Sequence, residues 1–333
     1  MRKLLLAFLL LSSLLTAGCF SHSKNYSDTR FLMDTVVKID ARGESEQILR
    51  QTVDEAFRVF TEVADETDRY QDGAANGLYR LNASAGRGPF TAGSHLLYLA
   101  RMSKEQPFEE FDASLAPLID LWRRHGIAKT VPGTEELAAA QSLTGKNKYT
   151  VDAASGTVTL LTGAGLDLGA LAKGYAVDKA AAILTGNKKI AGALVNAGGN
   201  IKAVGTKPDG KPWRIALQHP RKSDDFLGVI KLAPQEAVAT SGDYQRYYEA
   251  GGQRFHHLLD PQTGLPARHA IAVTVVAPSA LTADFYSTLL FVLPPEKAIM
   301  TVESNSELGA VIVRPDNSVY VSPSLATRFE PAR

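Results

Sequence analysis

The segment from Thr240 to Ala267, TSGDYQRYYEAGGQRFHHLLDPQTGLPA, constrains the fold of this 333-residue chain more than any other part of it. Two strand-like runs flank the turn Ala250-Gly251-Gly252, and such runs joined by a glycine-bearing turn predict a β-hairpin. We expect the hairpin to gather four polar side chains near one end of a sheet: Ser241, Asp243, His257 and Asp260.

Two interpretations of this hairpin remain open on local chemistry. A histidine beside carboxylates and the backbone amides of a glycine-rich turn suits proton transfer next to an anion. The alternative is a polar hairpin in which Asp and Thr side chains only cap turns.

The rest of the chain mixes helical and strand-like patterns. Apolar residues recur at helical spacing between Glu44 and Asp65, which predicts an amphipathic helix. Further helices are expected at 95–104, 135–143, 171–184 and 283–292. Strands are expected at 36–39, 192–195, 213–218, 228–232, 237–240, 270–276, 308–313 and 318–321, with a strand pair over 151–161. Because these elements interleave without strict βαβ alternation, we expect an α+β fold with largely antiparallel sheets flanked by helices.

Composition narrows the class of protein. Hydrophobic residues make up 45% of the chain, which is enough to bury a sizeable core. The net charge is +1, and a nucleic-acid-binding domain would show a basic face, so no nucleic-acid partner is expected. The single cysteine, Cys19, excludes an intramolecular disulfide.

The N-terminus predicts export and anchoring. Arg2 and Lys3 precede the apolar run 4–15, which suits a signal-peptide core but falls short of the ~20 apolar residues of a membrane span. The run ends at Thr16-Ala17-Gly18-Cys19, which resembles a bacterial lipoprotein processing site. We expect a signal peptide over 1–18, lipidation at Cys19 and a polar tether over 19–29. The protein would then be lipid-anchored in the cell envelope, on the periplasmic side of a bacterial membrane. An ordinary secretory signal with an incidental cysteine is the alternative.

Five ordered motifs resemble those of the ApbE family of FAD:protein FMN transferases. They are FDASLAPLIDLW at 111–122, DLGALAKGYAVD at 167–178, NAGGNI at 196–201, the 240–267 segment, and ADFYST at 283–288. The similarity runs from Met33 to the C-terminus. It implies one ApbE-like domain over 30–333, with FAD bound in a cleft between two subregions.

The resemblance also implies an activity. Family members transfer FMN from FAD to a Ser or Thr hydroxyl of an acceptor flavoprotein, such as a subunit of a membrane redox complex, and release AMP in a Mg²⁺-dependent reaction. Some relatives act instead as metal-dependent FAD pyrophosphatases, with water as the nucleophile. A non-catalytic flavin-binding lipoprotein is a third reading, but binding alone would not need a base such as His257.

The metal ligands implied by the family are Asp284, Thr288 and the backbone carbonyl of Ala172. Asp284 and Thr288 are four residues apart, so a helix places their oxygens on one face. Structural roles for both are also possible: a carboxylate near a helix N-terminus, and a hydroxyl bonded to the preceding turn.

The remaining implied site residues contact the flavin nucleotide. Lys173 would supply a point charge for phosphate, Tyr70 would stack on the flavin nucleotide, and Gly174 would let the backbone approach a ligand. Two positions depart from the family pattern: Asp34 replaces the usual Gly after Met33, and Asn200 replaces a more frequent Asp. The full implied set is Met33, Tyr70, Asp112, Lys173, Gly198, Gly199, Asn200, Ser241 and Gly242.

His257 is the expected general base. It directly precedes the apolar pair 258–259 and Asp260, whereas His256 is expected to project from the other face of the strand. Asp243 and Asp260 are expected to orient His257 or to tune its pKa, with turn capping as the alternative for both.

Overall fold

The computed structural model describes residues 23–207 and 209–332. The expected signal peptide and the expected lipidation site, Cys19, lie outside these residues. Within the described ranges, no helix combines the length and apolar character needed to cross a bilayer.

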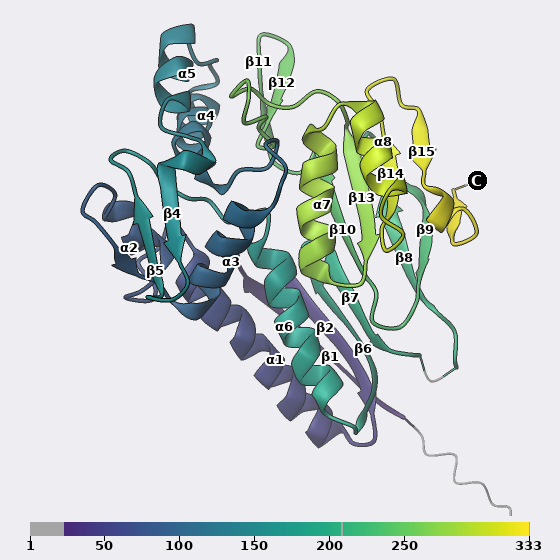
Figure 1. The fold of residues 1–333 in the computed structure, drawn as a ribbon. Helices are drawn as coiled ribbons and strands as arrows, with labels where there is room; N and C mark the ends of the chain where they lie inside the picture. The colour runs from purple at the N-terminus through teal and green to yellow at the C-terminus, as the bar shows by residue number, and fades with distance from the viewer. Residues whose placement is uncertain (1–22, 208, 333) are drawn as a thin grey trace, which may run out of the picture.

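An eight-stranded antiparallel sheet forms the centre of the protein (Figure 1). In spatial order its strands are β1 (Lys24–Leu32), β2 (Thr35–Gly43), β6 (Ile190–Ala197), β7 (Asn200–Gly205), β10 (Ala237–Gly242), β13 (Ala272–Ala277), β14 (Gly309–Val313) and β15 (Val319–Val321). Each neighbouring pair is antiparallel. The predicted α+β fold with largely antiparallel sheets is confirmed.

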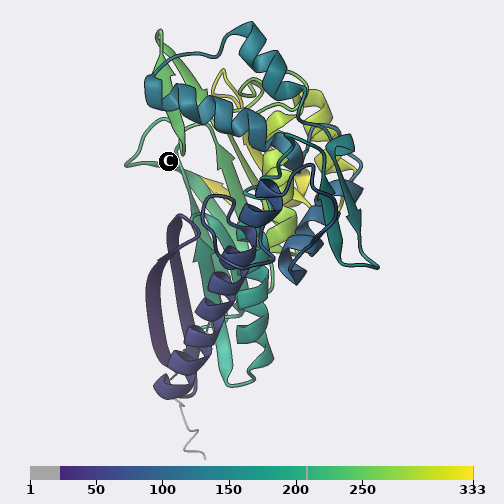
Figure 2. The ribbon, with the colours of Figure 1, turned by 90° about the vertical axis from the view of Figure 1, so that its left-hand side faces the viewer.

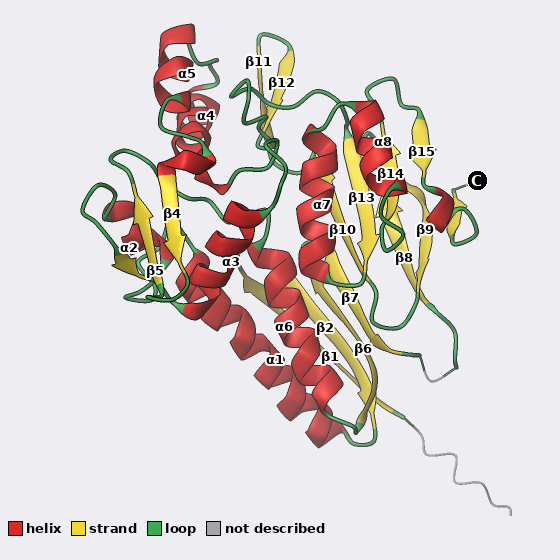
Figure 3. Ribbon diagram, in the orientation of Figure 1, coloured by secondary structure: helices red, strands yellow, loops and turns green. Residues whose placement is uncertain are grey.

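Helices cover one face of this sheet (Figure 3). They are α1 (Glu46–Thr67), α6 (Ala172–Gly186), α7 (Ala280–Val292) and, beside α7, α8 (Pro295–Glu303). In α1 the side chain of Ser45 accepts the Ile48 N–H, and one apolar stripe is buried against the core. α7 is buried on nearly all sides, which matches its almost uniformly apolar sequence.

A small sheet covers the opposite face. Its antiparallel strands are β8 (Trp213–Gln218), β9 (Phe226–Leu232) and β16 (Phe329–Pro331). Inward-facing residues of β8, such as Ile215, pack on Val238 and Val276 of the central sheet and form a second core. The central sheet is therefore buried on both faces, and β13 is buried along its whole length.

A smaller subregion packs beside the helical face. It contains α2 (Leu78–Ala83), α3 (Ser94–Glu105), α4 (Ala116–Ala128) and α5 (Thr134–Gln141), with the sheet β3 (Phe90–Thr91), β5 (Thr157–Leu160) and β4 (Tyr149–Asp152). Short 3₁₀ turns occur at Ala113–Leu115, Lys146–Lys148 and Pro323–Leu325.

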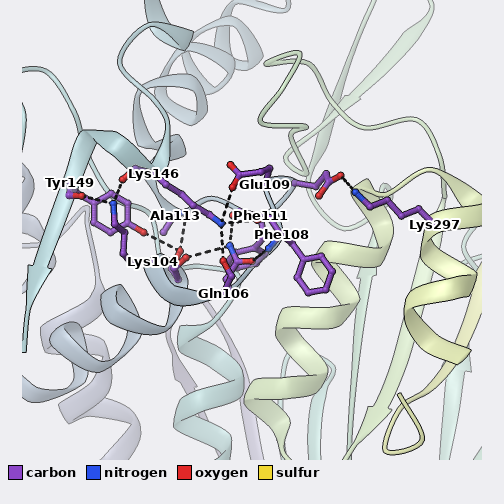
Figure 4. Close-up of polar contacts among 11 residues, drawn as sticks. Lys104, Gln106, Phe108, Glu109, Phe111, Ala113, Lys146, Tyr149 and Lys297 are labelled. Carbon is purple, nitrogen blue, oxygen red and sulfur yellow. Dashed lines mark hydrogen bonds and ion pairs between the residues drawn. The ribbon is translucent and has the colours of Figure 1, made fainter. Parts of the chain in front are cut away.

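The loop 106–112 joins the smaller subregion to α7 and α8 (Figure 4). Lys146 donates to the carbonyls of Gln106 (2.8 Å) and Phe108 (2.9 Å), which fixes one end of the loop. Phe111 packs on Phe285 of α7, with ring centroids 4.6 Å apart. The two subregions are thus tied together one residue from Asp284.

The expected tether is corrected by the structure. Residues 24–29 belong to β1, which pairs along its length with β2 beside α1 (Figure 2). Exposed and partly buried residues alternate from Asn25 to Leu32, and this two-residue period fits a strand with one covered face. A flexible tether could therefore end no later than residue 23.

The predicted hairpin is confirmed as β11 (Tyr247–Ala250) and β12 (Gln253–His256), joined at Gly251-Gly252. The two strands form a separate small sheet. Ser241 lies instead at the end of β10 in the central sheet, so the hairpin extends beyond that sheet.

Candidate active site

His257 directly follows β12 and has one ring nitrogen fixed. Its Nδ1 lies 3.1 Å from the carbonyl oxygen of Arg246. Because a carbonyl oxygen can only accept, we assign the proton to Nδ1, which leaves the Nε2 lone pair free. Desolvation by the surrounding protein, with the charges of Arg246 and Lys173, lowers the pKa of His257 to about 4, although the residue also faces solvent. At neutral pH the imidazole is uncharged and can accept a proton.

His256 has no free ring nitrogen. Its Nε2 lies 2.9 Å from the carbonyl oxygen of Ala267, and its Nδ1 accepts the Leu258 N–H at 3.3 Å. Burial lowers the pKa of His256 to about 4. The geometry gives His256 a structural role and leaves His257 as the histidine able to act on a ligand.

In the described part of the chain, Asp243 and His257 do not form the expected contact. Asp243 instead forms a bidentate pair with Arg221, at 2.6 and 2.7 Å. The expectation that Asp243 orients the base is therefore wrong: the carbonyl of Arg246 holds the ring, and the carboxylate is committed to a guanidinium.

Asp260 caps its own turn. Its carboxylate accepts the Gln262 N–H at 2.9 Å and the Thr263 hydroxyl at 3.0 Å. Within the described residues it has no hydrogen bond to His257, so the turn-capping alternative describes this aspartate.

Asp284 is a buried carboxylate at the crossing of α6 and α7, only 4% exposed. Its Oδ2 accepts the Gly174 N–H at 2.9 Å. Burial raises the pKa of Asp284, while the charge of Lys173 acts to lower it. The same lysine charge acts on His257, so Lys173 lies within electrostatic range of both groups.

Asn200, the first residue of β7, also faces Asp284. Its amide acts to lower the carboxyl pKa, yet its buried Nδ2 forms no hydrogen bond of normal geometry. Among the described residues, a buried amide donor without a well-formed hydrogen bond thus lies beside a buried carboxylate with one backbone partner, an arrangement that is typical of a site completed by a ligand or ion.

A cluster of hydroxyl groups continues along α7. Ser241 Oγ lies 2.9 Å from Ser287 Oγ and 3.3 Å from Thr288 Oγ1. Ser287 in turn donates to the carbonyl of Asp284 at 2.9 Å. The cluster joins the end of β10 to α7 and brings Ser241 and Thr288 together. The neighbouring Gly242 cannot become alanine without a clash, because a Cβ would lie 2.4 Å from the Tyr244 ring.

These residues fit a hard cation. Three or more His, Cys, Asp or Glu side chains do not cluster for metal binding in the described ranges. Mg²⁺ needs no such cluster, since it uses one or two carboxylates with other oxygens and waters. Asp284, Thr288 and the carbonyl of Ala172, the first residue of α6, would supply only oxygen donors, and no cationic side chain among the described residues is hydrogen-bonded to the Asp284 carboxylate.

Gly174 allows α6 and α7 to cross closely. A Cβ at this position would lie 2.4 Å from the Ala280 carbonyl and 2.7 Å from the Asp284 Cβ. The expected ligand approach at Gly174 is therefore corrected: the glycine serves helix packing, and its N–H reaches Asp284.

Asp178 is a site residue that the sequence analysis did not single out. Its carboxylate accepts the N–H groups of Ala280 (2.9 Å) and Leu281 (2.8 Å), the first two residues of α7. Lys202 pairs with Asp178 at 3.0 Å and donates to the carbonyl of Pro278. Asp178 thus fixes the start of the helix that carries Asp284.

The turn between β1 and β2 and the turn between β6 and β7 lie close together. Met33 (φ 52°) and Asp34 (φ 57°) both adopt the left-handed conformation of a two-residue hairpin turn between β1 and β2. Gly198 (φ 58°) contacts the β1–β2 hairpin. Its N–H donates to the carbonyl of Val36, and a Cβ at this position would lie 2.3 Å from Thr35 Oγ1. Gly199 has a φ of 97° and open space around its Cα. Asp tolerates the left-handed region, which explains how Asp34 replaces a glycine.

The other predicted ligand contacts lie on the smaller subregion or at its border. Tyr70 is 44% exposed, and the guanidinium carbons of Arg69 and Arg123 each lie 4.7 Å from the centroid of its ring. Asp112 accepts the Ser114 N–H at 2.7 Å and caps a 3₁₀ turn. Lys173 donates to the carbonyl of Gly169 at 3.0 Å. A hollow of about 680 Å³ in this subregion, bordered by Arg69, is lined by none of the predicted site residues.

Comparison with known proteins identifies the family. The ApbE family model matches residues 33–312. A protein named FAD:protein FMN transferase from Klebsiella pneumoniae is 30% identical over 93% of this chain and 96% of its own, and one from Vibrio cholerae is 32% identical over 97% and 98%. Solved structures agree. The ApbE protein of Thermotoga maritima has a TM-score of 0.81 and 29% identity over 92% of this chain and 99% of its own. The flavin transferase ApbE of Vibrio cholerae has a TM-score of 0.77 and 27% identity over 92% and 99%. The chain belongs to the ApbE family.

Proposed function

We propose that this ApbE-family enzyme, an FAD:protein FMN transferase, moves the FMN half of FAD onto a Ser or Thr hydroxyl of an acceptor protein. One observation carries the proposal. His257, a neutral imidazole with a free Nε2, and the buried carboxylate of Asp284 both lie within range of the charge of Lys173. A base and an oxygen-rich cation site around one anion-binding lysine suit phosphoryl transfer.

The reaction forms one bond and breaks one. The acceptor hydroxyl oxygen attacks the FMN phosphorus, and the bond from that phosphorus to the oxygen of the AMP phosphate breaks. His257 Nε2 takes the hydroxyl proton, while the Arg246 carbonyl holds the opposite nitrogen in its protonated form. AMP leaves, and FMN stays on the acceptor as a phosphoester. Lys173 would attract the phosphate oxygens before the reaction.

Mg²⁺ would be held by Asp284, Thr288 and the Ala172 carbonyl. When bound, it would offset negative charge on the phosphates. The buried, raised-pKa carboxylate of Asp284 supports this assignment, because a cation would stabilise its charged form. We also propose that FAD lies between the two subregions, with Tyr70 near the flavin nucleotide. In that case the partly exposed Tyr70 ring, which contacts the guanidinium groups of Arg69 and Arg123, would exchange at least one of these contacts for the ligand.

Mass spectrometry tests the proposal. The enzyme, FAD and Mg²⁺ are incubated with candidate acceptor domains, such as those of membrane redox-complex subunits, and intact masses are measured. The acceptor should gain one FMN at a Ser or Thr as AMP appears, and its flavin fluorescence should survive denaturation. If FAD is consumed but only free FMN and AMP form with every acceptor, the enzyme is an FAD pyrophosphatase.

We further propose that the mature protein is a lipoprotein on the periplasmic side of a bacterial membrane. The support is the signal-like run before Cys19. Cys19→Ser should move the protein from the membrane fraction to the soluble fraction. A wild-type protein that is already soluble and unlipidated would contradict the anchor.

A further inference from the structure

A hollow of about 260 Å³ adjoins the segment that carries His257. His256 lines it, and the next residue, His257, directly follows β12 and is not among the lining residues. Three arginines line the hollow: Arg221, Arg254 and Arg268. The lining includes one acidic side chain, that of Asp243.

Of the three arginines, Arg268 alone has no ion pair with a carboxylate among the described residues, and the two ion pairs of Arg254 are long. Arg221 is neutralised by its bidentate pair with Asp243. The guanidinium of Arg254 lies 3.7 Å from Asp243 and 3.7 Å from Glu249, beyond hydrogen-bond distance. Arg268 donates to the carbonyl of Arg254 at 2.8 Å, which does not offset its charge. The hollow therefore has an excess of positive charge.

The charge and size of the hollow select its ligand. The whole chain has a net charge of only +1, so this arginine concentration is a local feature. A volume of about 260 Å³ is below the ~300–1,000 Å³ of typical small-molecule sites, and it suits one oxyanion better than a dinucleotide. Arginine forks bind carboxylate and phosphate oxygens in pairs.

We propose that this arginine pocket, formed by Arg221, Arg254 and Arg268, binds a carboxylate of the acceptor protein near its target Ser or Thr. The inference rests on the proposed flavin transfer. Asp243 in the pocket is two residues from Ser241, and His256 is next to His257. An extended chain advances ~3.3–3.6 Å per residue, so an acidic side chain a few positions from the target can occupy the pocket while the hydroxyl reaches His257.

A lipid surface fits the pocket less well. Asp243 and His256 are recessed within it, with 7% and 4% of their surface exposed, and a flat headgroup layer would not reach a concave site of this size. An acidic side chain on a protruding peptide would reach it, and charge complementarity would also guide the acceptor to the hairpin.

Peptide binding without FAD tests the proposal. Two fluorescent peptides contain the same central threonine and differ only in carrying aspartates or asparagines. At low salt, wild type should bind the aspartate peptide about tenfold more tightly, as expected for one charge-assisted contact. Arg268→Glu, a change at an exposed residue, should abolish the preference, and Arg254→Gln should reduce it. Arg101→Glu, on the exposed surface of α3, is the matched control and should preserve it.

Further measurements separate the sources of the oxyanion. Inorganic phosphate should compete with the aspartate peptide and not with FAD. Equal binding of both peptides to wild type, including no measurable binding of either, overturns the proposal. An Arg268→Glu variant that keeps the peptide preference also overturns it. If that variant instead loses inhibition of FMN transfer by AMP, or binding to phosphatidylglycerol vesicles, the pocket binds a nucleotide phosphate or a lipid headgroup. Because peptide binding is measured without FAD, a failure of FMN transfer in the mass assay overturns the proposed function separately.

Discussion

Asp178→Ala should destabilise the protein and weaken its proposed Mg²⁺ dependence together. The carboxylate makes hydrogen bonds of 2.9 and 2.8 Å to the first N–H groups of α7, at Ala280 and Leu281, which are 0% and 8% exposed. Charge-assisted hydrogen bonds contribute about 1.5–3 kcal/mol each. The Asp178 side chain is 21% exposed, which lowers the total, so we expect the free energy of unfolding to fall by about 3–4 kcal/mol.

The effect on the site follows from helix geometry. Ala280 and Asp284 are about one turn apart on α7, so a shift at the helix start moves the Asp284 carboxylate relative to α6. We expect the Mg²⁺ concentration for half-maximal FMN transfer to rise by on the order of tenfold, as for other residues that orient metal ligands. Asp178→Asn, which keeps one acceptor oxygen, should show smaller changes in both quantities, with a loss of about 1–2 kcal/mol.

Urea unfolding monitored by circular dichroism gives the stability, and Mg²⁺ titration of transfer activity gives the metal requirement. Asp316→Ala is the control, because it removes an exposed carboxylate that only caps the Ser318 N–H. The reasoning is refuted if Asp178→Ala is no less stable than this control. It is also refuted if stability falls while the Mg²⁺ requirement stays unchanged, since Asp178 would then act only on folding.

Three other predictions concern the histidines and the metal. His257→Ala should slow FMN transfer by ~10²–10⁴-fold in a single-turnover assay, whereas His256→Ala should mainly lower the unfolding midpoint; the reverse pattern would show that the base is misassigned. Asp284→Asn should abolish Mg²⁺-dependent FAD turnover while FAD binding, measured by flavin fluorescence, persists; turnover that survives chelation in this variant would exclude the site. The third concerns pH. The pKa of His256 is 6.5 in the unfolded chain and about 4 in the folded protein, so the unfolded chain binds more protons between pH 6.5 and 4. The contribution of the neutral His256 to the free energy of unfolding should therefore be complete above pH 6.5 and decline as the pH falls toward 4. His256 should contribute about 2 kcal/mol to the loss of unfolding free energy between pH 7 and 5 measured by urea unfolding, and a His256→Gln variant with an equally steep decline would refute this origin.

Periodicity in the sequence predicted the elements whose burial alternates or follows a helical stripe. The stripe of α1, from Leu49 to Val63, is buried as expected, and the pair β4–β5 turns near Ser155-Gly156. β1 was missed because its polar sequence, KNYSDTRFL, does not look like a strand. Its pairing with β2 and its contact with α1 depend on residues far along the chain, which local propensity does not report.

Proline explains two further differences. The helix expected over 283–292 ends at Val292, before Pro294-Pro295, but Pro295 also begins α8, where the missing N–H costs nothing. Pro117 similarly occupies the first turn of α4, a helix that the sequence analysis did not predict. In both cases proline marks the start of a helix as well as a break.

The site residues were easier to name than their contacts. The preference for His257 over His256 followed from position in the motif, and the structure supplies a physical reason in the ring nitrogens that each leaves free. The partner of His257, however, is a backbone carbonyl. Such a partner leaves no trace in residue type, so the nearby carboxylates of Asp243 and Asp260 were chosen instead. The role of Asp178 was also hidden, because the N–H groups that it caps lie about 100 residues further along the chain.

The buried carboxylate of Asp284 links the stability of this fold to its chemistry. Burying a charge without a full set of partners is expensive, and the raised pKa of Asp284 records that cost. In the described structure its partners are one backbone N–H and the more distant charge of Lys173, while the adjacent Asn200 amide lacks a normal hydrogen bond. An apolar residue would pack there at lower cost. Since the surrounding network of Gly174 and Asp178 holds Asp284 in this position, the fold accepts a local loss of stability that a bound cation would offset. The proposed metal site therefore coincides with a buried carboxylate that has no ion-pair partner among the described residues.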